Sequence, residues 1–159
     1  MAVRRGKRRK FWMNLYPGKL PVEVRFGYKS PPGDSDLYPS VHTKKTPVSA
    51  WVFFPREPYY LSSMIHEGVH LIGWAEENLS QEEMFALVPH GDMAWDLGTK
   101  ALLEEARCRL MDRWTLRLFD EIRQERVPYS LERRFDKPFV PALDDPKFKP
   151  RSSAGRGKA

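Results

Sequence analysis

The stretch Leu61-Ser-Ser-Met-Ile-His-Glu-Gly-Val-His-Leu-Ile-Gly-Trp74 combines a helical pattern with a metal-binding motif, the run H-E-x-x-H formed by His66, Glu67 and His70. A helix turns about 100° per residue, so two imidazoles four residues apart lie on one face and can share a tetrahedral Zn²⁺. Glu67 lies about 100° round from His66, beside the metal position. There its carboxylate can accept a proton from a zinc-bound water.

The other residues of this stretch fit a helix with one apolar side. The same rotation places the apolar positions on an arc roughly opposite His66: Leu61, Met64, Ile65, Gly68, Leu71, Ile72 and Ala75. At the middle of the arc, Gly68 lowers helix propensity but permits a neighbouring element to approach closely. We therefore predict that the helix packs its apolar side on a core and presents the motif on its polar side. The alternatives are a surface helix whose His and Glu are only solvated, or a core helix with a hydrogen-bonded His.

The composition predicts one globular domain in the cytoplasm. The chain has 159 residues, of which 41% are hydrophobic and 13% aromatic, enough for a core. We expect neither a membrane partner nor export, because the sequence has no long apolar run and its first ten residues lack a signal-peptide segment. The single Cys108 excludes an internal disulfide and a Cys-rich zinc ribbon, and we expect it to be a small buried hydrophobe.

Basic residues are concentrated at the two ends of the chain. The formal net charge is +6, yet residues 11–146 keep only 16 basic residues against all 21 acidic ones. We predict basic disordered tails at residues 1–10 and 144–159, on either side of a domain at residues 11–143. The tails could contact nucleic acid through its phosphates, steer the protein to another anionic partner, or only aid solubility.

The first half of the chain predicts a small sheet. Residues 22–28 alternate apolar and polar side chains, residues 50–54 form a short apolar run, and residues 11–15 suggest a further strand. Residues 30–47 read as a long loop that contains one edge strand around residues 38–43. These segments all precede or adjoin the motif helix.

The second half predicts helices. After a break at residues 76–79, Ser80-Gln-Glu-Glu83 is a capping box that opens a short helix, which Pro89 ends. Gly91 and Asp92 can cap a long helix over residues 93–126. The expected fold is α+β, with a small mixed sheet packed on the active-site helix and on the long C-terminal helix.

A catalytic zinc site usually needs a third protein ligand, and Glu104 is the preferred candidate. It is the only charged residue in an apolar stripe of the long helix: Leu97, Ala101, Glu104, Cys108, Met111, Thr115, Leu118 and Ile122. Leu103, Leu110 and Trp114 widen this apolar arc, and Glu104 still points near its middle. A carboxylate in an apolar stripe loses hydration that a cation can replace. The alternative explanations are a salt bridge between Glu104 and Arg107, or a tilted helix whose end is exposed to solvent.

His90 is the alternative third ligand. It lies between Pro89 and Gly91 at the start of the long helix, where a loop could direct its imidazole to the metal. The other candidates are Glu82, Glu83 and Glu105, but the cap accounts for Glu83 and an exposed pair with Arg109 accounts for Glu105. We expect His42, in the Lys-rich loop, to have no special role.

The chain resembles the zincin metallopeptidases through His66-Glu67-Gly68-Val69-His70 on a helix that follows an apolar strand at residues 51–54. The resemblance covers about residues 48–112. With Glu104 as third ligand, the chain resembles a small gluzincin, a group whose pattern takes the last ligand from a Glu on a later helix. With His90 it resembles the SprT-like group, which has His-Gly at the start of such a helix, followed by an aromatic residue, here Trp95.

The expected function is that of a zinc metalloendopeptidase acting on a protein or peptide substrate. Zn²⁺ would polarise the scissile carbonyl and activate a water, and Glu67 would take the proton and pass it to the leaving amine. The alternative is a catalytically inactive zincin-like binding module, or a structural or accessory protein whose basic tails contact nucleic acid.

Overall fold

Four strands form the main sheet of the protein, whose computed structural model describes residues 7–130. They are β1 (Arg9–Tyr16), β2 (Lys19–Phe26), β3 (Ser40–Lys45) and β4 (Val48–Phe54), in the spatial order β1-β2-β4-β3. The central strands β2 and β4 run parallel, whereas β1 pairs antiparallel with β2 and β3 pairs antiparallel with β4. The sheet is therefore mixed, with β1 and β3 at its two edges.

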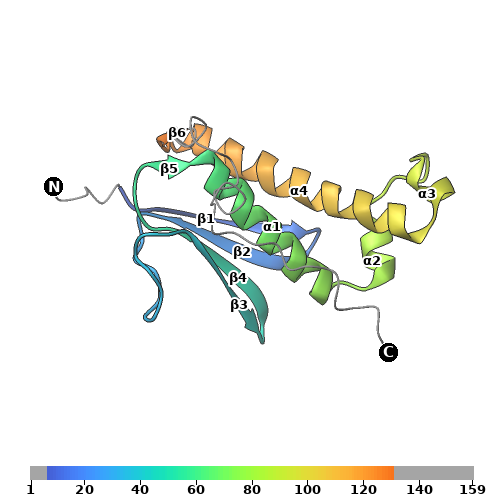
Figure 1. Cartoon of the computed structure of the whole chain (residues 1–159), viewed down its shortest axis with the longest axis horizontal. Coiled ribbons are helices and arrows are strands. Elements are labelled where there is room, and N and C mark those ends of the chain that lie inside the picture. The colour runs from blue at the N-terminus through green and yellow to red at the C-terminus, as the bar shows by residue number, and fades with distance from the viewer. Residues whose placement is uncertain (1–6, 131–159) are drawn as a thin grey trace, which may run out of the picture.

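Two helices cover one face of this sheet, α1 (Leu61–Asn78) and α4 (Thr99–Gln124) (Figure 1). The short helices α2 (Gln81–Phe85) and α3 (Ala94–Leu97) connect them. A separate two-stranded pair joins β5 (Tyr59–Tyr60), just before α1, to β6 (Tyr129–Ser130), just after α4. The predicted α+β class is confirmed, with a small mixed sheet and a long C-terminal helix.

The core lies between the sheet and the helices. Alternate residues of the strands point into it, for example Val22 and Val24 on β2 and Val52 and Phe54 on β4, all of which are buried. This period of two buries one face of a strand and leaves the other for polar or aromatic side chains. The alternation in the sequence was therefore a correct signal for the sheet.

The element boundaries differ from the sequence predictions at several points. Gly98 has φ 102° and ψ −175°, which breaks the helix predicted over residues 93–126 into α3 and α4. The motif helix continues to Asn78 instead of breaking at residue 76. β1 begins at Arg9, so the disordered segment predicted for residues 1–10 extends too far, because Arg9 and Lys10 pair with β2. The tail predicted at residues 144–159 lies outside the described residues.

The predicted capping box is confirmed. The Ser80 hydroxyl accepts a hydrogen bond from the Glu83 backbone N–H, and the Glu83 carboxylate accepts one from the Ser80 backbone N–H. The predicted edge strand within the loop is also present, as β3, two residues later than expected. Within the described part of the chain, no helix has the length and apolarity needed to cross a lipid bilayer.

The buried face of α4 overlaps the predicted apolar arc only in part. The buried residues recur at every fourth position: Leu102, Ala106, Leu110, Trp114, Leu118 and Ile122. Glu104 lies two residues beyond Leu102, about 200° round the helix, and both Glu104 and Cys108 are exposed. The prediction was therefore right for the C-terminal part of the arc but wrong for Glu104 and for Cys108, which was expected to be buried.

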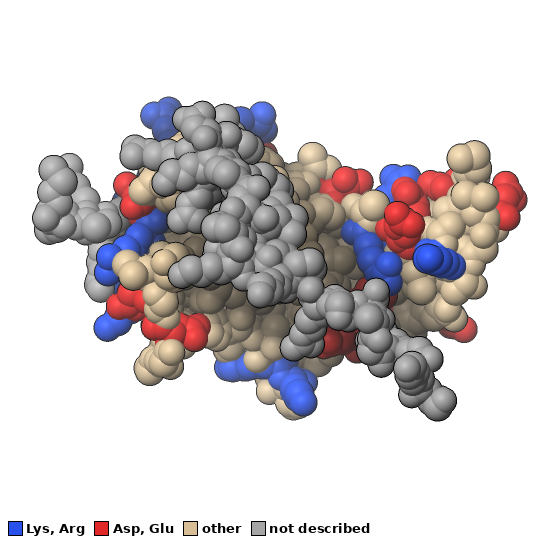
Figure 2. Space-filling view, in the orientation of Figure 1, with Lys and Arg blue, Asp and Glu red and all other residues tan. Residues whose placement is uncertain are grey.

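Acidic and basic side chains mix at the end of the molecule that holds α2, α3 and the start of α4 (Figure 2). Arg109 forms ion pairs there with Asp92 and with Glu105, the second being the exposed pair that the sequence predicted. Arg107 pairs with Glu76 through two hydrogen bonds of 2.7 and 2.8 Å, not with Glu104. The latter contact ties the start of α4 to the end of α1, so the two helices run antiparallel.

Candidate functional site

The two motif histidines converge on the exposed side of α1. The Nε2 atoms of His66 and His70 are 3.2 Å apart, and their rings meet edge to face with centroids 5.0 Å apart. Two nitrogen ligands of a tetrahedral zinc ion, each about 2.0–2.1 Å from the metal, would lie about 3.3 Å from one another. The observed separation therefore matches the one that zinc requires of two ligands.

The histidines line a groove between α1 and the edge strand β3. The groove has a volume of about 650 Å³, and the β3 side contributes Pro39, Ser40, Val41 and Thr43. The α1 side contributes residues that recur along one face of the helix: His66, Glu67, Val69, His70, Gly73, Trp74 and Glu77. The motif is therefore open to an extended ligand that follows the sheet edge.

Glu67 reaches this groove from a buried position, with 6% of its surface exposed. Burial raises the pKa of its carboxyl above the usual value, and the neighbouring His66 and His70 partly oppose this shift. Its carboxylate forms no hydrogen bond with any described residue. A raised pKa brings a carboxylate closer to the range in which it both accepts and returns a proton.

The opposite side of α1 is fixed by α4. The fully buried Trp114 donates a hydrogen bond from its indole Nε1 to the carbonyl oxygen of Met64 at 3.1 Å. Its ring lies against Gly68, where an added Cβ would come within 2.5 Å of Cδ1 and Nε1. The close approach predicted for Gly68 is thus confirmed, and it determines the depth at which α1 lies on α4.

Neither candidate for a third ligand lies in the groove. Glu104 is exposed near the start of α4. The hydrogen bonds with Glu76 mainly raise the pKa of Arg107, and the charge of Glu104 adds to this effect. His90 is exposed as well and stacks on Trp95 with ring centroids 5.3 Å apart. Over residues 7–130, no three His, Cys, Asp or Glu side chains form a group that could hold a metal. Of the predicted site residues, the groove therefore contains His66, Glu67 and His70.

The remaining candidates have other partners. Glu83 belongs to the capping box and also pairs with Lys19, and Glu82 is exposed on α2. His42 lies on β3, where its Nε2 is 2.6 Å from an Asp34 carboxylate oxygen. Its ring packs edge-on against Phe53. None of these residues lines the groove.

Sequence reasoning missed the far end and the opposite wall of the groove. Glu77 follows His66 by eleven residues, about three full turns, so helical periodicity alone could have placed it on the motif face. Ser40 and Thr43 carry no comparable signal. Their position depends on β3 pairing with β4 as the edge strand beside α1, which is a tertiary property.

Comparisons of the chain with protein-family models, with curated protein sequences and with solved structures found no significant match.

The burial of Glu67 predicts a pH-dependent effect on stability. A raised pKa in the folded state means that stability is lost as pH rises through the usual carboxyl pKa toward the raised one. Glu67→Gln removes the buried charge, so we expect its Tm in the presence of a chelator to exceed that of the wild type by a few degrees near pH 7. Near pH 3.5 the difference should disappear, because the carboxyl is then protonated in both states.

Thermal unfolding followed by circular dichroism measures this difference. Glu77→Gln is the matched control, since Glu77 lies on the same helix and in the same groove but is exposed, and its Tm should not change at either pH. An equal Tm difference for Glu67→Gln at both pH values would contradict the prediction, since packing and not charge would then explain it.

Proposed function

We propose that the protein is a zinc-dependent metallopeptidase that hydrolyses peptide bonds in a protein or peptide substrate. The observation that carries this proposal is the 3.2 Å separation of the His66 and His70 Nε2 atoms in an open groove, next to a buried Glu67. The same proposal includes a zincin-like fold, which the resemblance of the motif to zincins supports, and a cytoplasmic location.

The residues present fit a zinc ion in two respects. The imidazoles are exposed and their nitrogens have the separation of two tetrahedral ligands, so His66 and His70 would hold the metal through Nε2. A neutral imidazole and a nearby carboxylate are also the groups that catalytic zinc sites use. When bound, zinc polarises a carbonyl oxygen and lowers the pKa of water.

Glu67 would act as the general base. Its carboxylate would accept a proton from the attacking water and return it to the nitrogen of the leaving amine. This role requires one group that can both accept and donate a proton. Burial favours this role, because it weakens the preference of the carboxyl for its ionised form. The same burial keeps competing solvent away from the carboxylate.

The edge strand β3 would position the substrate. Among residues 7–130, β3 pairs with β4 on one side only, which leaves the backbone groups on its other side for a further strand. An extended peptide can add to such an edge by main-chain hydrogen bonds, largely independent of its sequence. The groove beside β3 would place such a peptide next to His66 and Glu67.

Zinc titration of metal-stripped protein tests the site. We expect the wild type to bind one zinc ion, and His66→Ala and His70→Ala to lower its affinity by about 100-fold or more, because each removes a ligand. His42→Ala is the control, since His42 is a partly exposed histidine that lies outside the groove. Glu104→Ala and His90→Ala, measured in parallel, test both third-ligand candidates. Equal zinc affinity in the wild type and His66→Ala would refute the site.

Cleavage of an unfolded protein substrate tests the reaction. Zinc-loaded wild type should release peptides, and removal of zinc by a chelator should abolish the release until zinc is restored. A wild type that binds zinc tightly but cleaves no unfolded substrate would overturn the peptidase proposal in favour of a metal-holding binding module.

A further inference from the structure

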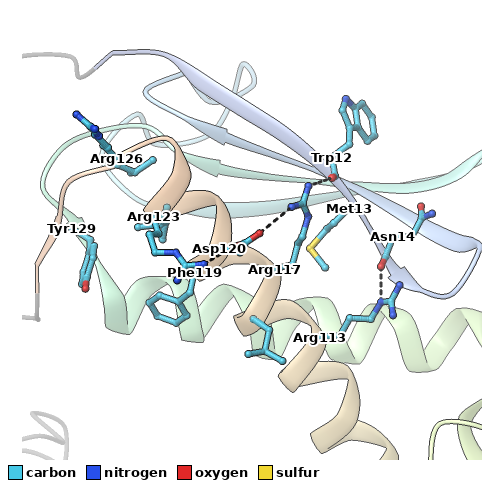
Figure 3. Close-up of a pocket in the computed structure, with 13 residues that line it drawn as sticks. Trp12, Met13, Asn14, Arg113, Arg117, Phe119, Asp120, Arg123, Arg126 and Tyr129 are labelled. Atoms are coloured by element: carbon cyan, nitrogen blue, oxygen red, sulfur yellow. Dashed lines mark hydrogen bonds and ion pairs between the residues drawn. The ribbon is translucent and has the colours of Figure 1, made fainter.

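A second groove lies at the opposite edge of the sheet, between β1 and the C-terminal half of α4 (Figure 3). Its volume is about 1170 Å³, larger than the roughly 300–1000 Å³ of small-molecule sites, which suits a polymer better than a metabolite. The lining residues are mostly basic or aromatic: Trp12, Met13, Asn14, Arg113, Leu116, Arg117, Phe119, Asp120, Ile122, Arg123, Arg126, Val127 and Tyr129. The proposed peptidase site does not use this groove.

The lining holds four arginines and one carboxylate, that of Asp120. Arg117 pairs with Glu121 at 2.6 Å and lies 3.8 Å from Asp120, so the excess of positive charge comes mainly from the other arginines. Arg113 Nε donates to the carbonyl oxygen of Asn14 at 2.9 Å, and Arg117 donates to that of Trp12 at 3.4 Å, so these two also protect the edge of β1. Arg123 pairs with Asp120 in an exposed setting. Arg126 has no ion-pair or hydrogen-bond partner through its side chain among the described residues.

Large apolar side chains are exposed at the same place. Leu116 is 73% exposed and Tyr129 52%. Phe119 meets Tyr129 edge to face, with ring centroids 6.4 Å apart, and both lie near the end of α4 (Figure 3). The Trp12 indole stands above β1 on the side away from α4, so its ring lies outside the groove, and only its carbonyl oxygen meets Arg117 there (Figure 3). Exposed rings near the end of α4 and the guanidinium group of Arg126, which is unpaired among the described residues, therefore share this groove.

We propose that this groove binds single-stranded nucleic acid. Guanidinium groups recognise phosphates by paired hydrogen bonds, and exposed aromatic rings stack on unpaired bases, the two features that single-strand-binding surfaces combine. From Arg113 to Arg123 the row of cations extends about 15 Å along α4, enough to follow several nucleotides. An acidic peptide would satisfy the cations but would leave the rings without a partner. The binding surface is thus part of the folded domain, in contrast to the tail contacts that the sequence suggested.

Fluorescence anisotropy with a labelled oligothymidine of about 20 nucleotides tests the charge requirement on the full chain. Arg123→Gln/Arg126→Gln removes two groove cations, and Lys45→Gln/Lys100→Gln removes two exposed cations outside it. At about 50 mM salt we expect the groove variant to bind about 10-fold more weakly and the control to change less than about 2-fold. The slope of log K against log salt should fall by about 1.4 in magnitude in the groove variant alone, because each phosphate contact contributes about 0.7.

A second pair of variants tests stacking. Tyr129→Ala removes an exposed ring at the groove, and Tyr38→Ala removes one that is 67% exposed outside it. Stacking on one ring predicts about 10-fold weaker binding for Tyr129→Ala and less than about 2-fold for Tyr38→Ala. Unchanged thermal unfolding curves, which the exposure of all these side chains predicts, show that each variant is folded.

Three outcomes would overturn the proposal. The first is a wild type that binds no oligothymidine at low salt, and the second is an equal loss in the groove and control variants, which would assign binding to diffuse charge. The third is a normal affinity of Tyr129→Ala together with equally tight binding of duplex DNA or of polyglutamate. That result would show a general anion site without base stacking. No arm of the experiment needs zinc, so the result is independent of the peptidase proposal.

Discussion

Glu67→Gln is expected to bind zinc as the wild type does while hydrolysing peptide bonds about 10² to 10⁴ times more slowly, the range for loss of a general acid–base group. Glutamine keeps the size of the side chain and its place beside His66, but its amide cannot accept a proton from water near neutral pH. The imidazole nitrogens that would hold zinc are not altered, so the metal content should be unchanged. The defect should appear mainly in kcat, because the carboxylate acts in the transition state.

Release of labelled peptides from an unfolded protein measures the rate of hydrolysis, and elemental analysis measures the zinc content of the variant. Glu77→Gln makes the same chemical change in the same groove, ten residues further along α1, and should retain activity within about 3-fold. A Glu67→Gln variant with near-normal turnover would exclude the carboxylate as the base. Loss of zinc would instead mean that Glu67 supports the metal.

The motif helix and the central strands were predictable because their signals are local. The seven apolar positions counted from His66 required only the helical period, and Met64, Gly68 and Leu71 among them are buried. Ile65, at the margin of the predicted arc, is exposed, since α4 covers only part of it. β2 showed the alternation that is typical of a strand with one covered face, and β4 showed the short apolar run that is typical of a buried strand.

The place of Glu104 could not be predicted because it depends on the rotation of α4. A helix with leucines on several sides offers more than one apparent stripe, and the fully buried Trp114 selects the one that includes Ala106 and Leu110. Glu104 and Cys108 then face solvent. The break at Gly98 was also unpredictable from periodicity, since apolar residues continue at helical spacing on both sides of it. The groove beside β3 required knowledge of strand order, which no single segment encodes.

Gly68→Ala is expected to be the most destabilising single-methyl change in α1. The new Cβ would lie 2.5 Å from Cδ1 and Nε1 of Trp114 and 3.0 Å from Cε of Met111. The methionine can move, but the indole is fully buried and hydrogen-bonded to Met64, so α1 and α4 must separate. Overpacking of this kind costs about 1–3 kcal/mol, which lowers Tm by on the order of 10 °C for a domain of this size.

Gly73→Ala is the matched control for that change. Gly73 lies on the same helix, and an added Cβ there has no atom within 4 Å. Because alanine has a higher helix propensity than glycine, this variant should leave Tm unchanged or raise it slightly. Thermal unfolding of both variants separates overpacking from propensity, and equal Tm values would refute the contact with Trp114.

Trp114→Phe in the Gly68→Ala background tests the same contact from the other side. Phenylalanine lacks the pyrrole part of the indole, to which Cδ1 and Nε1 belong, so it relieves the clash while giving up the hydrogen bond to Met64. We expect the double variant to be more stable than the sum of the two single changes, by a coupling energy of about 1 kcal/mol. Additive effects would contradict the close approach of α1 to α4.

Because this contact determines the depth of the helix behind His66 and Glu67, Gly68→Ala should also weaken zinc binding, and the Trp114→Phe change should restore part of it.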